Sequence, residues 1–385
     1  MSEIVDPQLQ AVENAVVDRS LTPLEAPVIS GLKLLGDIAL GSLVLNTIDE
    51  DQTLWICTNI EGWWVHPDPD VPDIPRGWGD GSYDAAGKWQ ARQITLSGTF
   101  IPRTLDNLQS ARDKLILATS LVRTGAWLVV QEDPPKASYV RLSGRPEIET
   151  VNARGRVDFS IGLRAADPVK YEYRDDDPDG FSTVEILAKN NSLSRDGRGT
   201  ILNRGTAEVT AIFQVSAPIT GPATIYNETT DELMIIVDPL RTASSFSVSQ
   251  AEIDNNLVTL TTSSAHDFQQ DDPINVSGLG DPYDGAYYAL DVPSSTTVVY
   301  EKTALDAGPS SVSGTVSRDA DIIEIDTYDQ EVAFNGLIEG TRSKVDTLTD
   351  WITLAPGLNT IRLIDEGQAS STAIMRVFYR SGWLG

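Results

Sequence analysis

The sequence is poor in the residues on which covalent and metal chemistry depend. Its 385 residues include one cysteine and two histidines. The single thiol, Cys57, excludes an internal disulfide and any zinc or iron–sulfur site built from thiolates, and its apolar neighbours predict a buried side chain. Neither a Gly-x-Ser-x-Gly nucleophile elbow nor a Gly-rich phosphate loop occurs. We therefore expect no catalytic site and no cofactor, so the protein is predicted not to be an enzyme.

Basic residues are also scarce. The chain has 29 Lys and Arg against 56 Asp and Glu, a net charge of −27. The negative electrostatic potential of this charge repels phosphate backbones and anionic lipid surfaces, so we expect no nucleic-acid partner. No run of eighteen apolar residues occurs and the N-terminus lacks an apolar signal segment, which predicts no membrane insertion and synthesis in a cytoplasm. The simplest role of the acidity is solubility.

Residues 1–172 are predicted to form an α+β domain of antiparallel strands with one packed helix. The cleanest strand is 157–163, where apolar and polar residues alternate. A short helix is expected over residues 7–18, and four prolines in residues 66–78 predict an exposed extended loop that cannot form a strand ladder. The main helix is expected from Leu105 to about Val122, with Thr104 as its N-cap. Its apolar stripe consists of Leu108, Ala111, Leu115, Ala118 and Val122.

The remainder of the chain is predicted to be all β. An acidic stretch at residues 175–180 is expected to be a linker. Short strands then recur to the C-terminus, and residues 206–216 alternate cleanly. Residues 249–318 have their own strand and turn pattern, so they are predicted to form a small β domain inserted into a β-sandwich made of residues 181–248 plus 319–385.

Three stretches make the sequence similar to a known family. The first is residues 156–171, which end the first domain. The second is Leu-Asn-Arg-Gly-Thr-Ala-Glu at 202–208, followed by residues 225–233. The third is residues 351–361, with the pattern Leu-x-Pro-Gly-x-Asn-x-Ile. In order and spacing they resemble the distal tail proteins of siphophages, the bacteriophages with long flexible tails.

The resemblance implies a mainly β virion protein of the tail tip, with a ring-forming N-terminal domain and a galectin-like C-terminal β-sandwich. It implies self-assembly into a homohexameric ring, and the tail tube protein and a tail-associated tip protein as partners. The function implied is a hub that joins the tail tube to the tail tip and host-adhesion apparatus, without enzymatic activity. The block at 249–318, the long loop at 66–89 and the N-terminal segment depart from the simplest members.

An alternative function is a host-surface glycan-binding adhesin that acts through the inserted domain. Aromatic rings stack on sugars, and polar neighbours bind hydroxyl groups. The candidates in the insertion are Tyr283, Tyr287, Tyr288 and Tyr300, and those in the first domain are Trp63, Trp64, Trp78 and Trp89. The competing interpretation, which we favour for the tryptophans, is that they pack in the core or in a subunit interface.

Two acidic groups were weighed as metal sites. Asp175-x-Asp177-x-Asp179-Gly180 matches the opening of a calcium loop, but Ile186 stands where that loop needs a glutamate. Asp68, Asp70 and Asp73 lie near His66, but the prolines between them work against convergence on one ion. We predict an acidic turn in the first case and no metal site in either. For His66 and His266, no triad arrangement is apparent, and His266 is expected in a solvated turn.

Overall fold

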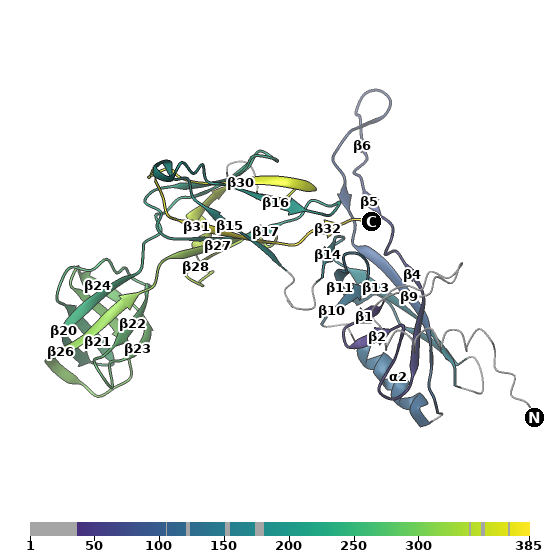
Figure 1. Ribbon diagram of the computed structural model, residues 1–385, viewed down its shortest axis with the longest axis horizontal. Coiled ribbons are helices and arrows are strands. Elements are labelled where there is room, and N and C mark those ends of the chain that lie inside the picture. Colours follow the sequence, from purple (N-terminus) through teal and green to yellow (C-terminus); the bar gives the residue numbers. More distant parts are fainter. Residues whose placement is uncertain are drawn as a thin grey trace, which may run out of the picture. The chain divides into compact units, whose positions relative to one another are not determined.

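The structure, a computed structural model, describes residues 37–104, 106–120, 124–150, 155–173, 181–338, 340–347, 351–368 and 370–385. The helix predicted over residues 7–18 and the linker at 175–180 lie outside these ranges. The chain divides into two compact units: residues 1–180 with 204–207 and 380–385, and residues 181–203 with 208–379 (Figure 1). In the described residues the chain is mainly β with one α-helix, as predicted.

The first unit is built on one antiparallel sheet. Its main path runs β2–β1–β10–β11–β13–β9–β4–β3, with β12 paired to β13, and with β14 paired to β11 and to the C-terminal strand β32. The strands are β1 (Ile38–Leu40), β2 (Leu43–Leu45), β3 (Thr47–Ile48), β4 (Leu54–Glu61), β9 (Arg92–Ile101), β10 (Ala126–Val130), β11 (Lys136–Leu142), β12 (Glu147–Thr150), β13 (Val157–Ala165), β14 (Lys170–Glu172) and β32 (Gly382–Trp383). The predicted strand at 157–163 is therefore confirmed and extends to Ala165.

Helix α2 (Asp106–Ala118) supplies the other part of this core. Ala111, Leu115 and Ala118 are buried and Leu108 packs against them, which confirms the predicted stripe. The helix ends earlier than predicted: the Thr119 amide still donates to the Leu115 carbonyl oxygen (3.0 Å), but the Ser120 amide donates to that of Leu117 (3.1 Å), a tighter i to i−3 bond that closes the last turn. The predicted end residues Leu105 and Val122 lie outside the described residues, and the Thr104 carbonyl oxygen accepts from the Asn107 amide (3.2 Å).

Aromatic rings fill the space between the sheet and the helix. Trp55 is fully buried and its ring lies 4.8 Å from the ring of Phe100. Cys57 is 7% exposed, and burial raises the pKa of its thiol to about 11. This cysteine is therefore an unreactive small core residue, as the sequence predicted.

Residues 67–90, called the arm below, leave this sheet as a long hairpin between β4 and β9 (Figure 1). Two short ladders hold it together: β5 (Pro69–Asp70) pairs with β8 (Lys88–Trp89), and β6 (Ile74–Pro75) pairs with β7 (Ser82–Tyr83). The segment is exposed, as predicted, but the prediction that its prolines prevent a ladder is wrong. In a two-stranded ladder each strand has an outer edge, and a proline is tolerated where its nitrogen faces solvent.

Two five-stranded antiparallel sheets form one part of the second unit, with orders β15–β31–β17–β27–β28 and β16–β30–β18–β19–β29. Gly199 of the second sheet lies against Ile186 of the first, so close that a Cβ would be 2.4 Å from Ile186 Cγ1. The strands are β15 (Ser182–Leu187), β16 (Arg198–Asn203), β17 (Ala211–Ser216), β18 (Ala223–Asn227), β19 (Glu232–Ile236), β27 (Ile322–Asp326), β28 (Glu331–Phe334), β29 (Val345–Thr347), β30 (Gly357–Asp365) and β31 (Ile374–Tyr379), with 3-10 helices at Asn191–Leu193 and Thr341–Lys344.

A seven-stranded sheet, called the insert below, forms the rest of this unit from residues 244–318. Its order is β23–β22–β26–β20–β21–β25–β24, and it has its own hydrophobic core. The strands are β20 (Ser244–Asp254), β21 (Leu257–Thr262), β22 (Pro273–Ser277), β23 (Gly285–Tyr288), β24 (Asp291–Ser294), β25 (Thr297–Glu301) and β26 (Ala307–Arg318). The block predicted at 249–318 lies within this range, and the division into three domains stays a prediction.

Candidate interaction sites

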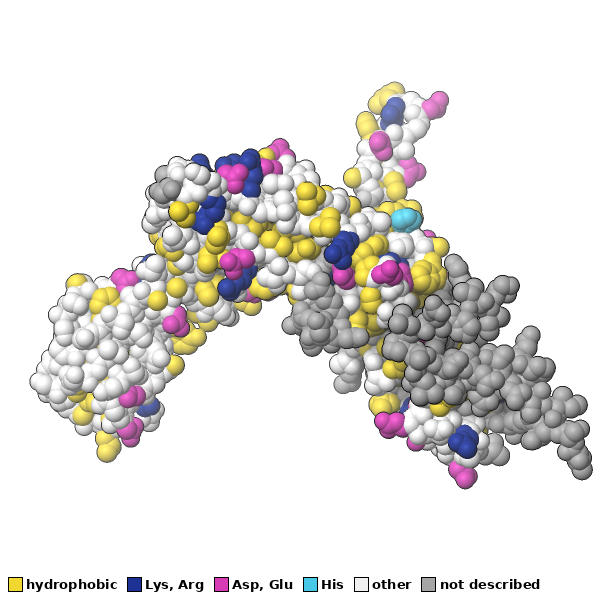
Figure 2. All heavy atoms as spheres, in the orientation of Figure 1, with side chains coloured by type: hydrophobic (Ala, Val, Ile, Leu, Met, Phe, Trp, Pro, Cys, Tyr) yellow, Lys and Arg dark blue, Asp and Glu magenta, His cyan; other side chains and the backbone are white. Residues whose placement is uncertain are grey.

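Several apolar side chains of the arm are exposed to solvent and do not pack in the core of the first unit. The indole of Trp78 is 97% exposed. Figure 2 shows hydrophobic, acidic and basic side chains side by side along this hairpin. The other large apolar residues exposed on it are Val71, Ile74, Tyr83 and Trp89. Clusters of exposed apolar and aromatic residues on a soluble protein mark contact surfaces.

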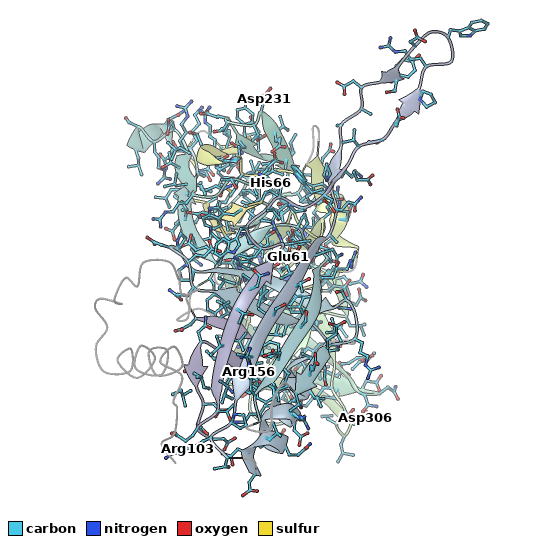
Figure 3. All side chains as sticks on the ribbon, turned by 90° about the vertical axis from the view of Figure 1, so that its right-hand side faces the viewer. Glu61, His66, Arg103, Arg156, Asp231 and Asp306 are labelled. Atoms are coloured by element: carbon cyan, nitrogen blue, oxygen red, sulfur yellow. The ribbon has the colours of Figure 1, made fainter. Side chains whose placement is uncertain are left out.

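The arm begins at a well-ordered base. Glu61 and His66 lie where the hairpin leaves the long strands, whereas Arg103 and Arg156 lie toward the opposite end of those strands (Figure 3). The His66 ring stacks on Trp89 at 5.7 Å between ring centroids, which joins the two sides of the hairpin. This base therefore restrains how the arm leaves the sheet.

Arg92, the first residue of β9, is the central element of this base. Its guanidinium is buried and donates to the carbonyl oxygens of Pro168 (3.0 Å), Gly62 (2.9 Å) and Val65 (2.7 Å), and to that of Leu384 near the C-terminus. Burial lowers the pKa of Arg92 to about 10, which leaves it charged at neutral pH. One cation thus holds together chain segments that are far apart in sequence.

Lys170 is a second buried cation beside the same segment. Its ammonium donates to the carbonyl oxygen of Trp63 (2.8 Å) and lies 4.8 Å from the Trp63 ring centroid and 5.7 Å from that of Trp64. Burial lowers the pKa of Lys170 to about 8, because desolvation outweighs the attraction of Glu132, and the positive charge of Arg92 lowers it further. Two cations therefore fix the chain that leads into the arm.

The four candidate tryptophans of the first domain divide into two groups. Trp63 is fully buried, and its indole NH donates to the carboxylate of Glu132, which also pairs with Lys136 (2.6 Å). This is the core role that the sequence favoured. Trp64, Trp78 and Trp89 are 49%, 97% and 44% exposed, so their rings are accessible in this unit.

The four candidate tyrosines of the insert divide in the same way. Tyr300 is fully buried, its hydroxyl donates to the Tyr283 carbonyl oxygen (2.8 Å), and burial raises its pKa. Tyr283 is 8% exposed. A buried ring cannot stack on a sugar, so these two residues are structural. Tyr287 is half-buried and stacks on Tyr300 at 4.2 Å, whereas Tyr288 is 55% exposed.

The candidate metal ligands near His66 do not form a metal site in the part of the chain that the structure describes. Asp68, Asp70 and Asp73 are exposed on the arm, and within the described ranges no group of three His, Cys, Asp or Glu side chains could hold a metal ion. Asp175, Asp177 and Asp179 lie outside those ranges. No helix of the described part is long and apolar enough to cross a membrane.

His266 lies, as predicted, in an exposed segment that follows a strand, β21, but its own ring is half-buried. Its ring packs at 4.7 Å on Phe268 and 6.0 Å from Phe246, and its Nδ1 accepts a bond from the Phe268 amide (3.3 Å). Burial lowers the pKa of the imidazole below its ordinary value. The reason is that this loop folds back over the first strand of the insert.

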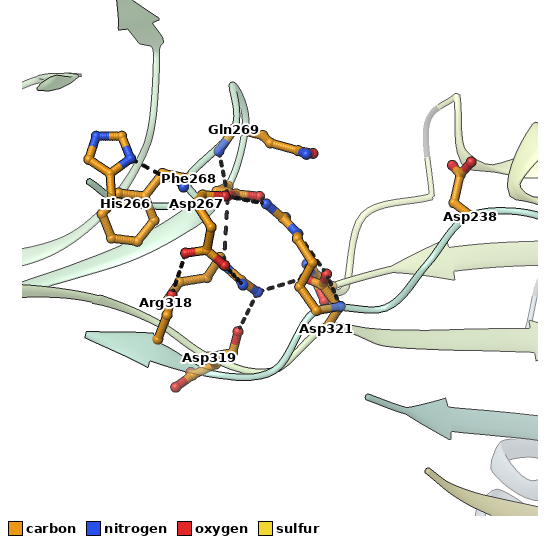
Figure 4. A network of polar contacts seen from close by, with 12 residues as sticks. Asp238, His266, Asp267, Phe268, Gln269, Arg318, Asp319 and Asp321 are labelled. Atoms are coloured by element: carbon orange, nitrogen blue, oxygen red, sulfur yellow. Dashed lines mark hydrogen bonds and ion pairs between the residues drawn. The ribbon is translucent and has the colours of Figure 1, made fainter. Parts of the chain in front are cut away.

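A network of ion pairs connects the insert to the strands that flank it (Figure 4). The fully buried Arg318 donates to Asp321 (3.1 Å) and Asp267 (2.8 Å), and Arg241 donates to Asp321 (3.0 Å) and Asp272 (3.0 Å). Ion pairs that include the buried Arg318, Asp272 and Asp321 thereby lie at both crossings between the insert and its host. Neither arginine was predicted from the sequence as part of a site.

No protein-family model matches the chain, and no curated protein matches it. Among solved structures, it is similar to the SPP1 Dit protein, described as a paradigm of the hub adsorption apparatus in phages that infect Gram-positive bacteria. The two are 11% identical over 84% of this chain and 93% of that chain, with a TM-score of 0.44.

The chain is also similar to chains of the phage P2 baseplate in its activated conformation. In the structure with Ca the identity is 10%, the match covers 89% of this chain and 96% of that chain, and the TM-score is 0.33. In the structure with Sr the identity is 11%, the coverages are 89% and 97%, and the TM-score is 0.27. All three solved structures are described as a phage hub protein or a phage baseplate.

Proposed function

We propose that this chain is the distal tail hub of a siphophage. In this proposal it is a structural protein of the virion, without enzymatic activity, located at the tail tip. It joins the tail tube protein to the tail-associated tip protein and the host-adhesion apparatus. The first unit forms a homohexameric ring, and the two five-stranded sheets are the galectin-like sandwich.

The observation that carries this proposal is the arm. It exposes large apolar and aromatic side chains, yet its base is fixed by Arg92 and Lys170. Exposed apolar surface on a fixed hairpin favours contact with another protein, because burying it removes that surface from water without first ordering the chain. Aromatic residues such as Trp78 dominate the binding energy of many interfaces.

The sheet of the first unit supports the same proposal. Its path ends in β2 and β3, short strands whose outer edges pair with no other strand that the structure describes. Free edges and exposed hairpins are potential sites of open-ended association, and closed cyclic assembly gives each surface a partner without unlimited growth. The arm of one copy is then expected to contact the next copy in the ring.

The experiment that tests this role is sedimentation of the full chain over a range of concentrations. Wild type is expected to form rings, and Trp78→Ala to weaken their formation by at least about tenfold in concentration. Leu305→Ala is the matched control, because Leu305 is 91% exposed but lies in the second unit. If wild type and Trp78→Ala associate equally, the arm is not part of the subunit interface.

The alternative function, a glycan-binding adhesin that acts through the insert, remains compatible with a ring. Of its four candidate residues, Tyr288 has the accessible ring. A hub could carry such a site on each copy, so the two functions do not exclude one another.

A further inference from the structure

The exposed Tyr288 lies beside a groove between the insert and the strands that flank it. The groove has a volume of about 1070 Å³. One wall is the loop before β22, with Gln269 and Gln270, together with Tyr288 at the end of β23. The other wall is the turn after β28, with Leu337 and Ile338.

Both walls are pre-formed. The Gln269 amide donates to the Asp272 carboxylate (2.7 Å), which fixes the first loop. Phe334 and Leu337 exchange backbone hydrogen bonds (2.8 and 2.9 Å), which close the turn of the second wall. A ligand therefore meets surfaces that need little ordering on binding.

The walls present an aromatic face and free amides. Tyr288 is 55% exposed, and Leu337 and Ile338 are 42% and 56% exposed. The side-chain amides of Gln269 and Gln270 make no hydrogen bond with any other residue that the structure describes, and Gln269 points away from the ion pairs in Figure 4. Each such amide offers both donors and an acceptor.

The charges that line the groove decide which ligands fit. Arg241 is committed to Asp272 and Asp321, and Lys344 is paired with Asp238 (3.1 Å). Asp271 adds a further carboxylate to the lining. With Arg318 also paired to Asp321 from behind the lining, the four carboxylates face three cations, and the remaining negative charge disfavours phosphate-bearing or otherwise anionic polymers. The ion pairs also make the floor too polar for the apolar stripe of a peptide helix.

We propose that this groove binds a neutral oligosaccharide. The ring of Tyr288 stacks on one sugar, and the amides of Gln269 and Gln270 exchange hydrogen bonds with its hydroxyl groups. The apolar side chains of the opposite wall contact the CH face of a second sugar. This site is independent of the hub role, since it lies wholly within the second unit.

The test uses the full chain on an array of neutral hexose and N-acetylhexosamine oligosaccharides, printed beside glycerol-phosphate polymers. Wild type is expected to bind at least one neutral oligosaccharide and not the phosphate polymers. Tyr288→Ala is expected to lower that affinity by at least about tenfold. Gln270→Ala, at an exposed position without side-chain partners, is expected to lower it several-fold.

Tyr328→Ala is the matched control, because Tyr328 is 58% exposed in the turn between β27 and β28 and does not line the groove. It should bind as wild type does. The proposal is overturned if no neutral oligosaccharide binds, if Tyr288→Ala and Gln270→Ala both bind normally, or if the phosphate polymers bind better. It is also overturned if Tyr288→Ala changes the oligomeric mass instead, since a second copy then fills the groove.

Discussion

Replacing Lys170 tests whether burial lowers the pKa of its ammonium and thereby makes the stability of the protein depend on pH. Its ammonium is fully buried, and its pKa is lowered from 10.5 to about 8. One pKa unit corresponds to about 1.4 kcal/mol, so charging this lysine in the folded state costs about 3 kcal/mol more than in the unfolded chain. Lys170→Met removes the titration and keeps an unbranched side chain of similar length.

The direction in which stability changes with pH follows from how tightly the folded and unfolded chains bind the Lys170 proton. Between about pH 8 and pH 10.5 the unfolded chain holds the Lys170 proton more tightly than the folded protein does, so stability rises with pH in this window. Below about pH 8 the full penalty of the buried charge is present. From pH 7.0 to pH 9.5 the free energy of unfolding of wild type should therefore rise by about 2 kcal/mol relative to that of Lys170→Met. This is less than the full penalty of about 3 kcal/mol, because pH 9.5 lies inside the window.

Urea unfolding followed by tryptophan fluorescence measures this difference. All tryptophans except Trp351 belong to the first unit, so the signal reports mainly on it. Lys88→Met, on the exposed arm, is the control and should show no such dependence. A stability gap between wild type and Lys170→Met that stays constant within about 0.5 kcal/mol from pH 7.0 to 9.5 would refute the reasoning.

Three further substitutions have defined outcomes. Arg318→Met should destabilise the second unit in thermal or urea unfolding by about 2–3 kcal/mol, since it removes one of the two cations that pair with the buried Asp321 and leaves only Arg241. Arg198→Met, in an exposed pair, should cost under about 1 kcal/mol. At a concentration too low for ring formation, Trp78→Ala should change the unfolding free energy by less than about 0.5 kcal/mol, because that side chain touches only solvent in the single chain. Gly62→Ala should lower the melting temperature, since its φ is +80° and a Cβ would lie 1.9 Å from a backbone oxygen; Gly77→Ala, with open space around it, should not. An unchanged melting temperature in Gly62→Ala would contradict the described turn.

The spacing of apolar residues predicted the strands and the helix whose buried face can be read from neighbouring positions in the sequence. Apolar residues alternating from Val157 onward gave strand β13, and the stripe through Ala111 and Leu115 gave helix α2. The C-terminal end of that helix was misplaced because the Ser120 amide bonds to the Leu117 carbonyl oxygen instead of continuing the helical pattern, which a stripe of apolar residues does not reveal.

The cationic sites were missed, although the sequence held a signal for one of them. Arg92 is in phase with Ile94 and Leu96 along β9, so strict alternation places it on the buried face. What makes that burial possible is a set of carbonyl oxygens from residues 62–65, Pro168 and Leu384. Those partners are distant in sequence, and periodicity cannot identify them.

The tyrosines of the insert show the same limit. Tyr300 follows Val298 by two residues in a strand, so alternation placed its ring inside rather than on a glycan surface. The groove beside Tyr288 could not be predicted, because its walls come from the insert and from the turn after β28, which become neighbours only in the folded unit.

The most direct test of the hub role is the native mass of the full-length protein. If the chain forms the proposed ring, mass spectrometry under native conditions should find a species of six times the 41.8 kDa chain mass, and negative-stain images should show closed rings. A protein that stays monomeric at every concentration, and also when mixed with a tail tube protein, would contradict the account.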